Sequence, residues 1–190
     1  MVLAAGAATR MGLPKATLPF ASTTMVGAVV DAAAVAALDP IVVVTGFHAE
    51  ETTEAVSGEA LTVHNPDPAA GNMSSLLTGI EAVGDVDGVV VLLADMPRVE
   101  SDLIVKLVNG VSHTGRRAGW VEYPEGRGHP IVLAQSAFAD VRKLTGTKAL
   151  WPFFEALSGG EVFALHTATQ RPIDVNTPAD YERIAGPATD

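Results

Sequence analysis

The sequence contains no cysteine among its 190 residues. This absence excludes a disulfide framework, cysteine-ligated zinc, iron–sulfur clusters and catalysis by a thiol. A chain without cysteine is compatible with a reducing compartment, and we expect the protein to be cytoplasmic.

Long apolar runs are also missing. The longest runs, IVVVT (41–45) and GVVVLLA (88–94), have the length of strands and fall short of the roughly 18 residues that a membrane span needs. The N-terminus has no basic region before an apolar stretch, so we expect neither a signal peptide nor a membrane partner. The first apolar run is only MVLAA (1–5). The first strand is therefore either short or preceded by residues that this sequence lacks.

Basic residues are scarce, with 12 Lys and Arg against 22 Asp and Glu and a formal net charge of −10. This balance argues against a nucleic-acid partner, which needs a basic surface. A small anionic substrate is still compatible with it, because a local cationic loop and a metal ion can outweigh the overall charge. The hydrophobic content of 48% indicates a globular chain, and the length suits a single domain over residues 1–190.

Apolar, β-branched runs alternate with helical patterns along the first half of the chain. The runs at 2–5, 40–46, 60–65 and 88–95 are typical of buried parallel strands. Between them, the segments 23–38, 49–58 and 73–84 have helical spacing, with Gly58 and Gly84 as C-terminal stops. This order predicts a three-layer, Rossmann-like α/β fold with a mostly parallel central sheet and right-handed crossovers.

The second half is less regular. It predicts a helix capped by Ser101 and a strand pair around the turn EGRG (125–128). A last helix, 177–185, has Thr177 as its cap. The other expected elements are a helix over 101–110, strands over 119–124, 129–134, 161–167 and 171–176, and short helices over 136–144 and 148–157.

The loop after the first strand, from Gly6 to Lys15, is the first candidate site, because ligands of α/β sheets gather at the carboxyl ends of strands. Backbone amides in a loop of glycine and alanine can approach phosphate oxygens, and Arg10 and Lys15 add positive charge. The spacing is neither a P-loop nor a G-x-G-x-x-G motif. The alternative is a solvated loop with two surface cations. The coincidence of strand, glycines and cations favours phosphate binding.

Two carboxylates are candidate metal ligands. Asp95 ends the run LLAD (92–95), where it could hold Mg²⁺ against triphosphate oxygens or cap the following helix. Asp174 and Asn176 are two residues apart on an expected strand, so their side chains would face the same side. They could complete a metal site, or they could be turn residues before the last helix.

Two further polar segments contain candidate ligand-binding residues. In NPDPAAGNMSSL (65–76), Asn72, Ser74 and Ser75 could bind an anion or a base at a helix N-terminus, or Ser74 could simply cap that helix. In GRGHP (126–130), Arg127 and His129 lie where a tight turn would also explain the glycines and the proline. The remaining histidines have no ligand spacing and are assigned no role: His48, His64, His113 and His166.

Several of these segments together resemble one family. LAAGAATRMGLPK (3–15) resembles the signature loop L-A-[AG]-G-x-[SG]-x-R-[ML]-G-x-x-K of the molybdenum cofactor nucleotidyltransferases. LLADMP is similar to their metal-aspartate motif, and DVNTPADYERI to their C-terminal motif. NPDPAAGNMSSLLTGI and GRGHPIVL are similar to the segments between these motifs, and the likeness covers nearly the whole chain in the right order.

The resemblance implies transfer of a CMP or GMP unit from CTP or GTP to a phosphorylated acceptor such as molybdopterin, with Mg²⁺ as cofactor and pyrophosphate as leaving group. The A-A-G and G-L-P-K versions of the loop resemble the cytidylyltransferase branch, which favours CTP. A molybdoenzyme or its chaperone is then a candidate partner. Carried over by position, the nucleotide-binding residues are Leu3, Ala4, Ala5, Gly6, Arg10, Lys15, Asn72, Ser74 and Ser75. The catalytic residues are Arg10, Lys15 and Asp95, the metal ligands are Asp95 and Asp174, and the acceptor-binding residues are His129 and Asn176.

The sequence departs from the family pattern in three places. It lacks the few residues that the family usually has before VLAAG (2–6). Ala7 and Ala8 stand where the signature loop often has serine or glycine, and Thr147 and Ala149 stand where the cytidylyltransferase branch often has aspartate and glycine. The last departure bears on molybdopterin as the acceptor. Two alternative functions belong to other classes. One is an NAD(P)H- or flavin-dependent enzyme of the nicotine blue oxidoreductase kind, and the other is a non-catalytic nucleotide-binding relative.

Overall fold

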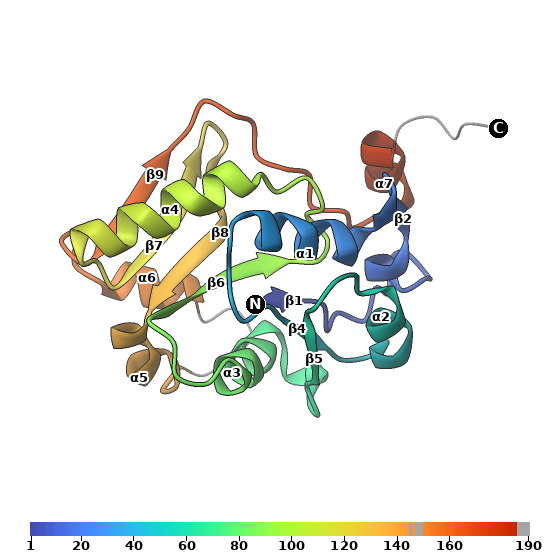
Figure 1. Cartoon of the computed structure of the whole chain (residues 1–190), viewed down its shortest axis with the longest axis horizontal. Helices are drawn as coiled ribbons and strands as arrows, with labels where there is room; N and C mark the ends of the chain where they lie inside the picture. Colours follow the sequence, from blue (N-terminus) through green and yellow to red (C-terminus); the bar gives the residue numbers. More distant parts are fainter. Residues whose placement is uncertain (145, 147–149, 186–190) are drawn as a thin grey trace.

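A seven-stranded sheet runs through the computed structural model, which describes residues 1–144, 146 and 150–185 (Figure 1). The strands are β1 (Val2–Leu3), β4 (Val42–Thr45), β5 (Leu61–His64), β6 (Gly88–Leu93), β7 (Ala118–Tyr123), β8 (Gly126–Ala134) and β9 (Val162–His166). Their order is β5-β4-β1-β6-β8-β7-β9. Four of the six strand pairs are parallel, and β8 is antiparallel to both of its neighbours. The prediction of a mostly parallel sheet is therefore confirmed.

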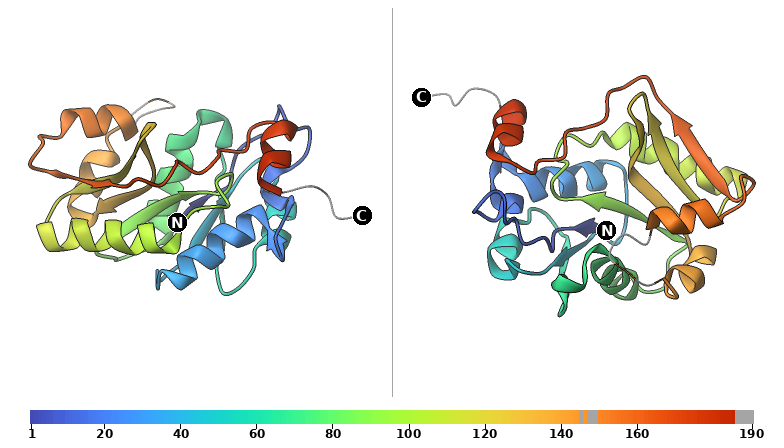
Figure 2. Two further views of the ribbon diagram at one scale, coloured as in Figure 1. Left: turned by 90° about the horizontal axis from the view of Figure 1, so that it is seen from above. Right: turned by 180° about the vertical axis from the view of Figure 1, so that it is seen from behind.

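Helices cover both faces of the sheet (Figure 2). On one face lie α1 (Met25–Val35) and α4 (Ser101–Thr114), and on the other lie α3 (Asn72–Ala82), α5 (Phe138–Val141) and α6 (Leu150–Ala156). Successive strand residues point to opposite faces. Val42 and Val44 accordingly belong to the core cluster beneath α3, whereas Val43 belongs to the cluster beneath α1 and α4. Because both faces are buried, the central strands β4 and β6 consist almost wholly of apolar residues, and the predicted three-layer arrangement is confirmed.

Smaller elements surround the loop that follows β1. They are the 3-10 turns η1 (Lys15–Thr17) and η2 (Pro68–Ala70), the hairpin strands β2 (Pro19–Phe20) and β3 (Thr23–Thr24), and the helices α2 (Ala49–Ala55) and α7 (Pro178–Ala185). The 3-10 turn η3 (Gln135–Ala137) instead follows β8 at the start of β6, where the Gln135 amide donates to the Asp87 carbonyl at 2.8 Å. Helix α7 lies beside the β2–β3 hairpin (Figure 1), and the Tyr181 hydroxyl donates to the Pro19 carbonyl at 2.6 Å. The β2–β3 hairpin and α7, which lie far apart in the sequence, therefore meet at this side of the sheet.

The direction of the chain through the sheet reverses at β1. From β1 the chain continues to β4 and β5 on one side, and it then returns to β6 on the other side of β1. In open α/β sheets, ligands bind outside the carboxyl ends of the strands at such a reversal. Within the described residues, every helix is too short or too polar to cross a bilayer.

Several predicted boundaries are wrong. Helix α1 begins only at Met25, because the Thr24 hydroxyl caps it by accepting from the Gly27 amide at 3.0 Å. Ser101 does not cap α4, since Glu100 occupies that position and gives no side-chain cap; the helix continues to Thr114. The turn between β7 and β8 is Pro124–Glu125, so Gly126 and Arg127 already belong to β8.

The segment 171–176 is not a strand, contrary to the prediction. It runs as irregular chain from β9 back across the molecule to α7 (orange to red in Figure 1). Pro172 has no amide hydrogen, and the Val175 amide donates to the carbonyl of Asp95 at 2.9 Å rather than to a strand. Thr177 caps α7 as predicted, because its hydroxyl accepts from the Asp180 amide at 3.2 Å. Thr147 and Ala149 lie outside the described residues.

Candidate active site

A cavity of about 310 Å³ opens at the carboxyl ends of β1 and β6. Its walls come from the loop after β1, the turn after β6, the start of α3 and the segment before α7. Of the predicted site residues, those that line it are Leu3, Ala4, Ala5, Gly6, Lys15, Asn72, Ser75, Asp95, Asp174 and Asn176. The structure therefore brings together residues that lie far apart in the sequence, at the place where a doubly wound sheet binds its ligand.

The backbone of the loop after β1 is held close to the end of β4. The Ala4 amide donates to the Val44 carbonyl at 2.8 Å. A Cβ on Gly46 would lie only 2.7 Å from both the Cβ and the carbonyl oxygen of Ala5, so only glycine allows this approach. A Cβ on Gly6 would instead meet nothing within 4 Å. The loop therefore leaves its backbone accessible, as phosphate binding requires.

Both cations of this loop are bound by acidic or carbonyl groups from the rest of the site. The Lys15 ammonium forms an ion pair with Asp95 and donates to the Val175 carbonyl at 3.1 Å. The Arg10 guanidinium donates to Asn176 Oδ1 at 2.8 Å. Arg10 is exposed and does not line the cavity.

Asp95 lies in the turn directly after β6, and α4 begins only at Ser101. The alternative role of Asp95 as a helix cap is therefore wrong. Its Oδ2 atom contacts Lys15, whereas its Oδ1 atom is buried without a hydrogen-bond partner among the residues described. Burial raises the pKa of Asp95, and the nearby Asp174 carboxylate raises it further, while the Lys15 ammonium opposes this shift. A buried, unpaired carboxylate oxygen suits a divalent cation.

Asp174 and Asn176 reach the same cavity without sharing a strand face, because the segment is irregular chain. The Asn176 side-chain amide donates back to the Asp174 carbonyl at 3.3 Å. Across the described ranges, no group of three or more His, Cys, Asp or Glu side chains could hold a metal ion by itself. A cation bound by Asp95 and Asp174 would therefore need further oxygen ligands from a nucleotide and from water.

Asn72 and Ser75 line the cavity at the start of α3, but Ser74 does not. The Ser74 hydroxyl lies 2.7 Å from the Asp67 carbonyl and 2.9 Å from that of Gly71. It also accepts from the Asn65 side chain at 2.8 Å. Ser74 thus fixes the loop before the helix. It is not the N-cap, because Gly71 occupies that position.

His129 lies on β8, outside this cavity, and lines two others of about 310 and 400 Å³. Burial lowers the pKa of His129 to about 4, with Arg171 acting in the same direction and Asp174 opposing it. The ring is therefore neutral at physiological pH. The Tyr123 hydroxyl donates to the His129 carbonyl at 2.7 Å, which fixes this part of β8.

The sequence indicated no role for several residues around the cavity at the carboxyl ends of β1 and β6 (the nucleotide-sized cavity). His48 and Thr52 line it, and the His48 ring lies 3.4 Å from the Ala7 carbonyl. Gly46 supports the loop from behind. These roles follow from contacts between elements, for which a single sequence has no spacing signal.

Comparison with known proteins explains this arrangement. The model of the MobA-like NTP transferase domain matches residues 1–162. The chain therefore belongs to the MobA-like NTP transferase family. Asp174 and Asn176, which also line the cavity, lie beyond the matched residues.

Two proteins of similar sequence have different names. The chain is 29% identical over 144 residues to the bifunctional protein GlmU of Cupriavidus pinatubonensis. The aligned residues make up 75% of this chain but only 32% of that protein. It thus spans about a third of that relative's length. It is 31% identical over 142 residues to nicotine blue oxidoreductase of Paenarthrobacter nicotinovorans. Here the aligned residues make up 70% of this chain and 69% of that protein.

Among solved structures, the chain resembles Rv0371c from Mycobacterium tuberculosis H37Rv. The TM-score is 0.83 at 28% identity, and the match covers 97% of this chain and 94% of that one. A second structure of Rv0371c is a complex with manganese, with a TM-score of 0.79 at 27% identity over 97% of this chain and 95% of that one. The family assignment made from the sequence motifs is confirmed by these findings.

Proposed function

We propose that this MobA-like chain transfers a CMP unit from CTP to a phosphorylated acceptor and releases pyrophosphate, with Mg²⁺ as cofactor. The single observation that supports this most is the pairing of Lys15 with Asp95, whose second oxygen is buried and unpaired among the described residues. A cation and an oxygen ligand for a metal stand together beside an accessible backbone loop. That combination suits a metal-bound triphosphate.

The reaction needs positioning more than covalent chemistry. An acceptor phosphate oxygen attacks the α-phosphorus of CTP, the bond to the β-phosphate bridging oxygen breaks, and pyrophosphate leaves with the electron pair. In this proposal the backbone from Leu3 to Gly6 holds the nucleotide, and Arg10 and Lys15 bind the triphosphate and stabilise the leaving charge. No general base is needed, because the attacking phosphate oxygen is already ionised.

The metal ligands in this proposal are Asp95 and Asp174. Their oxygen atoms are the ligand type that Mg²⁺ prefers, and the bound ion would neutralise charge on the triphosphate. The manganese complex of the structural neighbour Rv0371c supports a divalent cation in this fold. His129 and Asn176 would face the acceptor. Because the segment before α7 contributes Asp174 and Asn176 to the site, we further propose that residues 1–190 act as a single domain.

A second candidate function is that of an NAD(P)H- or flavin-dependent enzyme of the nicotine blue oxidoreductase kind. The similarity to nicotine blue oxidoreductase over 69% of that protein favours it. A yellow purified protein, or consumption of NADH in the presence of a dye, would support this candidate. The two carboxylates beside Lys15 have no evident role in hydride transfer, and so the nucleotidyl transfer is preferred.

A thermal-shift panel tests the proposal. CTP, GTP, ATP, UTP, NADH and FMN are each added with and without Mg²⁺, and we expect a raised midpoint with CTP that depends on Mg²⁺. A ligand at 100 times its dissociation constant stabilises the folded state by about 2.7 kcal/mol. The variant Asp95→Ala should lose the Mg²⁺-dependent part. A shift with NADH or FMN alone would contradict nucleotidyl transfer, and CTP binding without pyrophosphate release would indicate a non-catalytic relative.

A further inference from the structure

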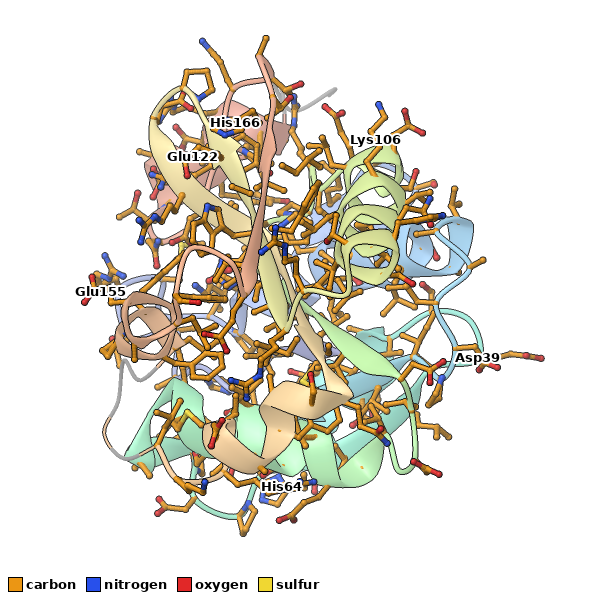
Figure 3. The ribbon with its side chains drawn as sticks, turned by 90° about the vertical axis from the view of Figure 1, so that its left-hand side faces the viewer. Asp39, His64, Lys106, Glu122, Glu155 and His166 are labelled. Carbon is orange, nitrogen blue, oxygen red and sulfur yellow. The ribbon has the colours of Figure 1, made fainter. Side chains whose placement is uncertain are left out.

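A second cavity, of about 400 Å³, adjoins the nucleotide-sized one and shares Asp174 and Leu93 with it. Its walls come from β8, from α6 and from the segment between β9 and α7. Glu155 on α6 stands at the outer edge of the molecule in Figure 3 and marks the rim of this cavity. Two arginines, Arg127 and Arg171, line the cavity together with His129.

Arg127 is held in place by an aromatic ring. Its guanidinium carbon lies 4.6 Å from the centre of the Trp120 ring, and the Trp120 indole is itself fixed by donating to Glu122 at 2.9 Å. Stacking on a ring leaves the N–H edge of a guanidinium accessible for an anion. Within the described part of the chain, Arg127 forms no ion pair.

Arg171 is held by its backbone and by close packing on β8. Its amide donates to the Glu125 carboxylate at 3.2 Å. A Cβ on Gly128 would lie 3.0 Å from Arg171 Cδ and 3.0 Å from the Tyr123 ring, so glycine lets the arginine stem lie against the strand. The side chain of Arg171, like that of Arg127, forms no ion pair with any residue that the structure describes.

No carboxylate of the described residues neutralises either arginine, although the chain has 22 acidic and only 12 basic residues. Arg117, by contrast, pairs with both Asp140 and Glu161. Both guanidinium groups line one cavity, and their planar forks match phosphate oxygens. We propose that Arg127 and Arg171 bind the anionic group of the acceptor and thereby select an anionic acceptor over a neutral one.

This assignment rests on the proposed function and narrows the class of acceptor. Because the cavity shares Asp174 with the nucleotide-sized one, a phosphate held by the two arginines lies on the acceptor side of the metal ligands. The carboxylate of Glu155 at the rim can accept from a hydroxyl or amino group. The acceptor is therefore a phosphomonoester whose body carries hydrogen-bond donors. Arg127 and Arg171 determine acceptor specificity and do not line the nucleotide-sized cavity.

The test measures binding of inorganic phosphate to the full chain by calorimetry. The nucleotide-sized cavity is first saturated with a non-hydrolysable α,β-methylene analogue of CTP and Mg²⁺, so that phosphate cannot bind at Lys15. We expect saturable phosphate binding to the unsubstituted chain. The variants Arg127→Gln and Arg171→Gln should each weaken it by about ten-fold or more, since each removes a charge-assisted hydrogen-bond donor.

Arg142→Gln is the matched control. The guanidinium carbon of Arg142 also lies near an aromatic ring, 5.8 Å from the centre of Phe138, but Arg142 does not line this cavity. It should leave phosphate binding unchanged. Unchanged phosphate binding in both cavity variants, or no binding to the unsubstituted chain, would overturn the assignment.

Binding of the CTP analogue is measured separately for every variant. If Arg127→Gln or Arg171→Gln abolishes analogue binding as well, the arginines do not act on the acceptor alone and the assignment is wrong. If the unsubstituted chain binds phosphate through these arginines but does not bind the analogue, the proposed nucleotidyl transfer fails while the anion site stands.

Discussion

Lys15 is the residue on which most contacts of the candidate site converge. Its ammonium group pairs with Asp95 and donates to Val175, and the two paired side chains are only 18% and 20% exposed. In the absence of ligand it therefore provides the positive charge that a metal ion would otherwise give to the Asp95 carboxylate. Under the proposed function Lys15 also binds the triphosphate, which would link the stability of the free protein to its affinity for nucleotide.

We expect Lys15→Met to destabilise the protein by about 1–3 kcal/mol, because it leaves a largely buried carboxylate without its partner. Urea unfolding measures the change in the free energy of unfolding. Lys106→Met is the matched control, since Lys106 pairs with Asp102 at 3.2 Å on an exposed helix face, where the side chains are 60% and 81% exposed. Such a pair contributes about 0–1 kcal/mol. Equal effects of the two substitutions would contradict the role given to Lys15.

His129 gives the protein a pH-dependent stability. Its pKa is lowered to about 4 in the folded protein, from 6.5 in an unfolded chain. Between these two pH values the unfolded state binds more protons than the folded state. The stability that depends on a neutral His129 ring is therefore fully present above about pH 6.5, and the free energy of unfolding falls as the pH drops towards 4. We expect a loss on the order of 2 kcal/mol between about pH 7 and about pH 4.5.

The measurement compares urea unfolding at the two pH values for the unsubstituted chain and for His129→Gln. Glutamine does not titrate, so the variant should lose less stability on acidification by about the amount assigned to His129. Identical pH profiles for the two proteins would show that the ring is not buried as described.

Single residues were predictable from the sequence where their position in the chain alone placed them at the site. Asp95 directly follows a buried strand, and Lys15 ends a loop that follows another, so the parallel sheet brings both to one edge. His48 and Gly46 belong to a different strand end, and their contacts with Ala7 and Ala5 depend on how that strand packs. No local pattern encodes such contacts.

At the scale of elements, α4 packs closely on β9. A Cβ on Gly110 in the middle of α4 would overlap the ring of Phe163 on β9. Glycine in a helix costs about 1 kcal/mol relative to alanine, but here it allows the helix to reach the sheet. The position is therefore governed by packing, not by helix propensity.

Gly110→Ala should consequently lower the free energy of unfolding, by about 1–3 kcal/mol, because overpacking outweighs the gain in propensity. Thermal unfolding followed by circular dichroism measures this change. Gly159→Ala is the control, since a Cβ on Gly159 would meet nothing within 4 Å. A higher midpoint for Gly110→Ala than for the unsubstituted chain would contradict the close packing of α4 on β9.

The same scale separates the elements that the sequence predicted from those it did not. The strands β4 and β6 are continuous apolar runs because both of their faces are buried, and these were predicted. The segment 171–176 (RPIDVN) was also predicted as a strand, yet Pro172 and the hydrogen bond from the Val175 amide to the Asp95 carbonyl keep it out of the sheet. Its path is set by its partners, which lie elsewhere in the chain.

At the scale of the whole molecule, the site is assembled from both ends of the chain. The contacts from Lys15 to Val175 and from Arg10 to Asn176 join residues 160 and 166 positions apart. The family model ends at residue 162, before this second group of contacts. The matched residues thus contain the whole sheet except most of β9, whereas the closure of the site depends on contacts with Val175 and Asn176.

The long distance in sequence between Lys15 and Val175 affects how the site forms during synthesis on the ribosome. Chains emerge from the N-terminus at about 5–20 residues per second, and early segments can fold before late ones exist. The loop that carries Lys15 emerges 160 residues before Val175 and 161 residues before Asn176. Such long-range contacts form late in folding. A nascent chain can therefore build most of its sheet before it has a complete cavity, and we expect it to gain affinity for nucleotide only after Val175 and Asn176 have emerged.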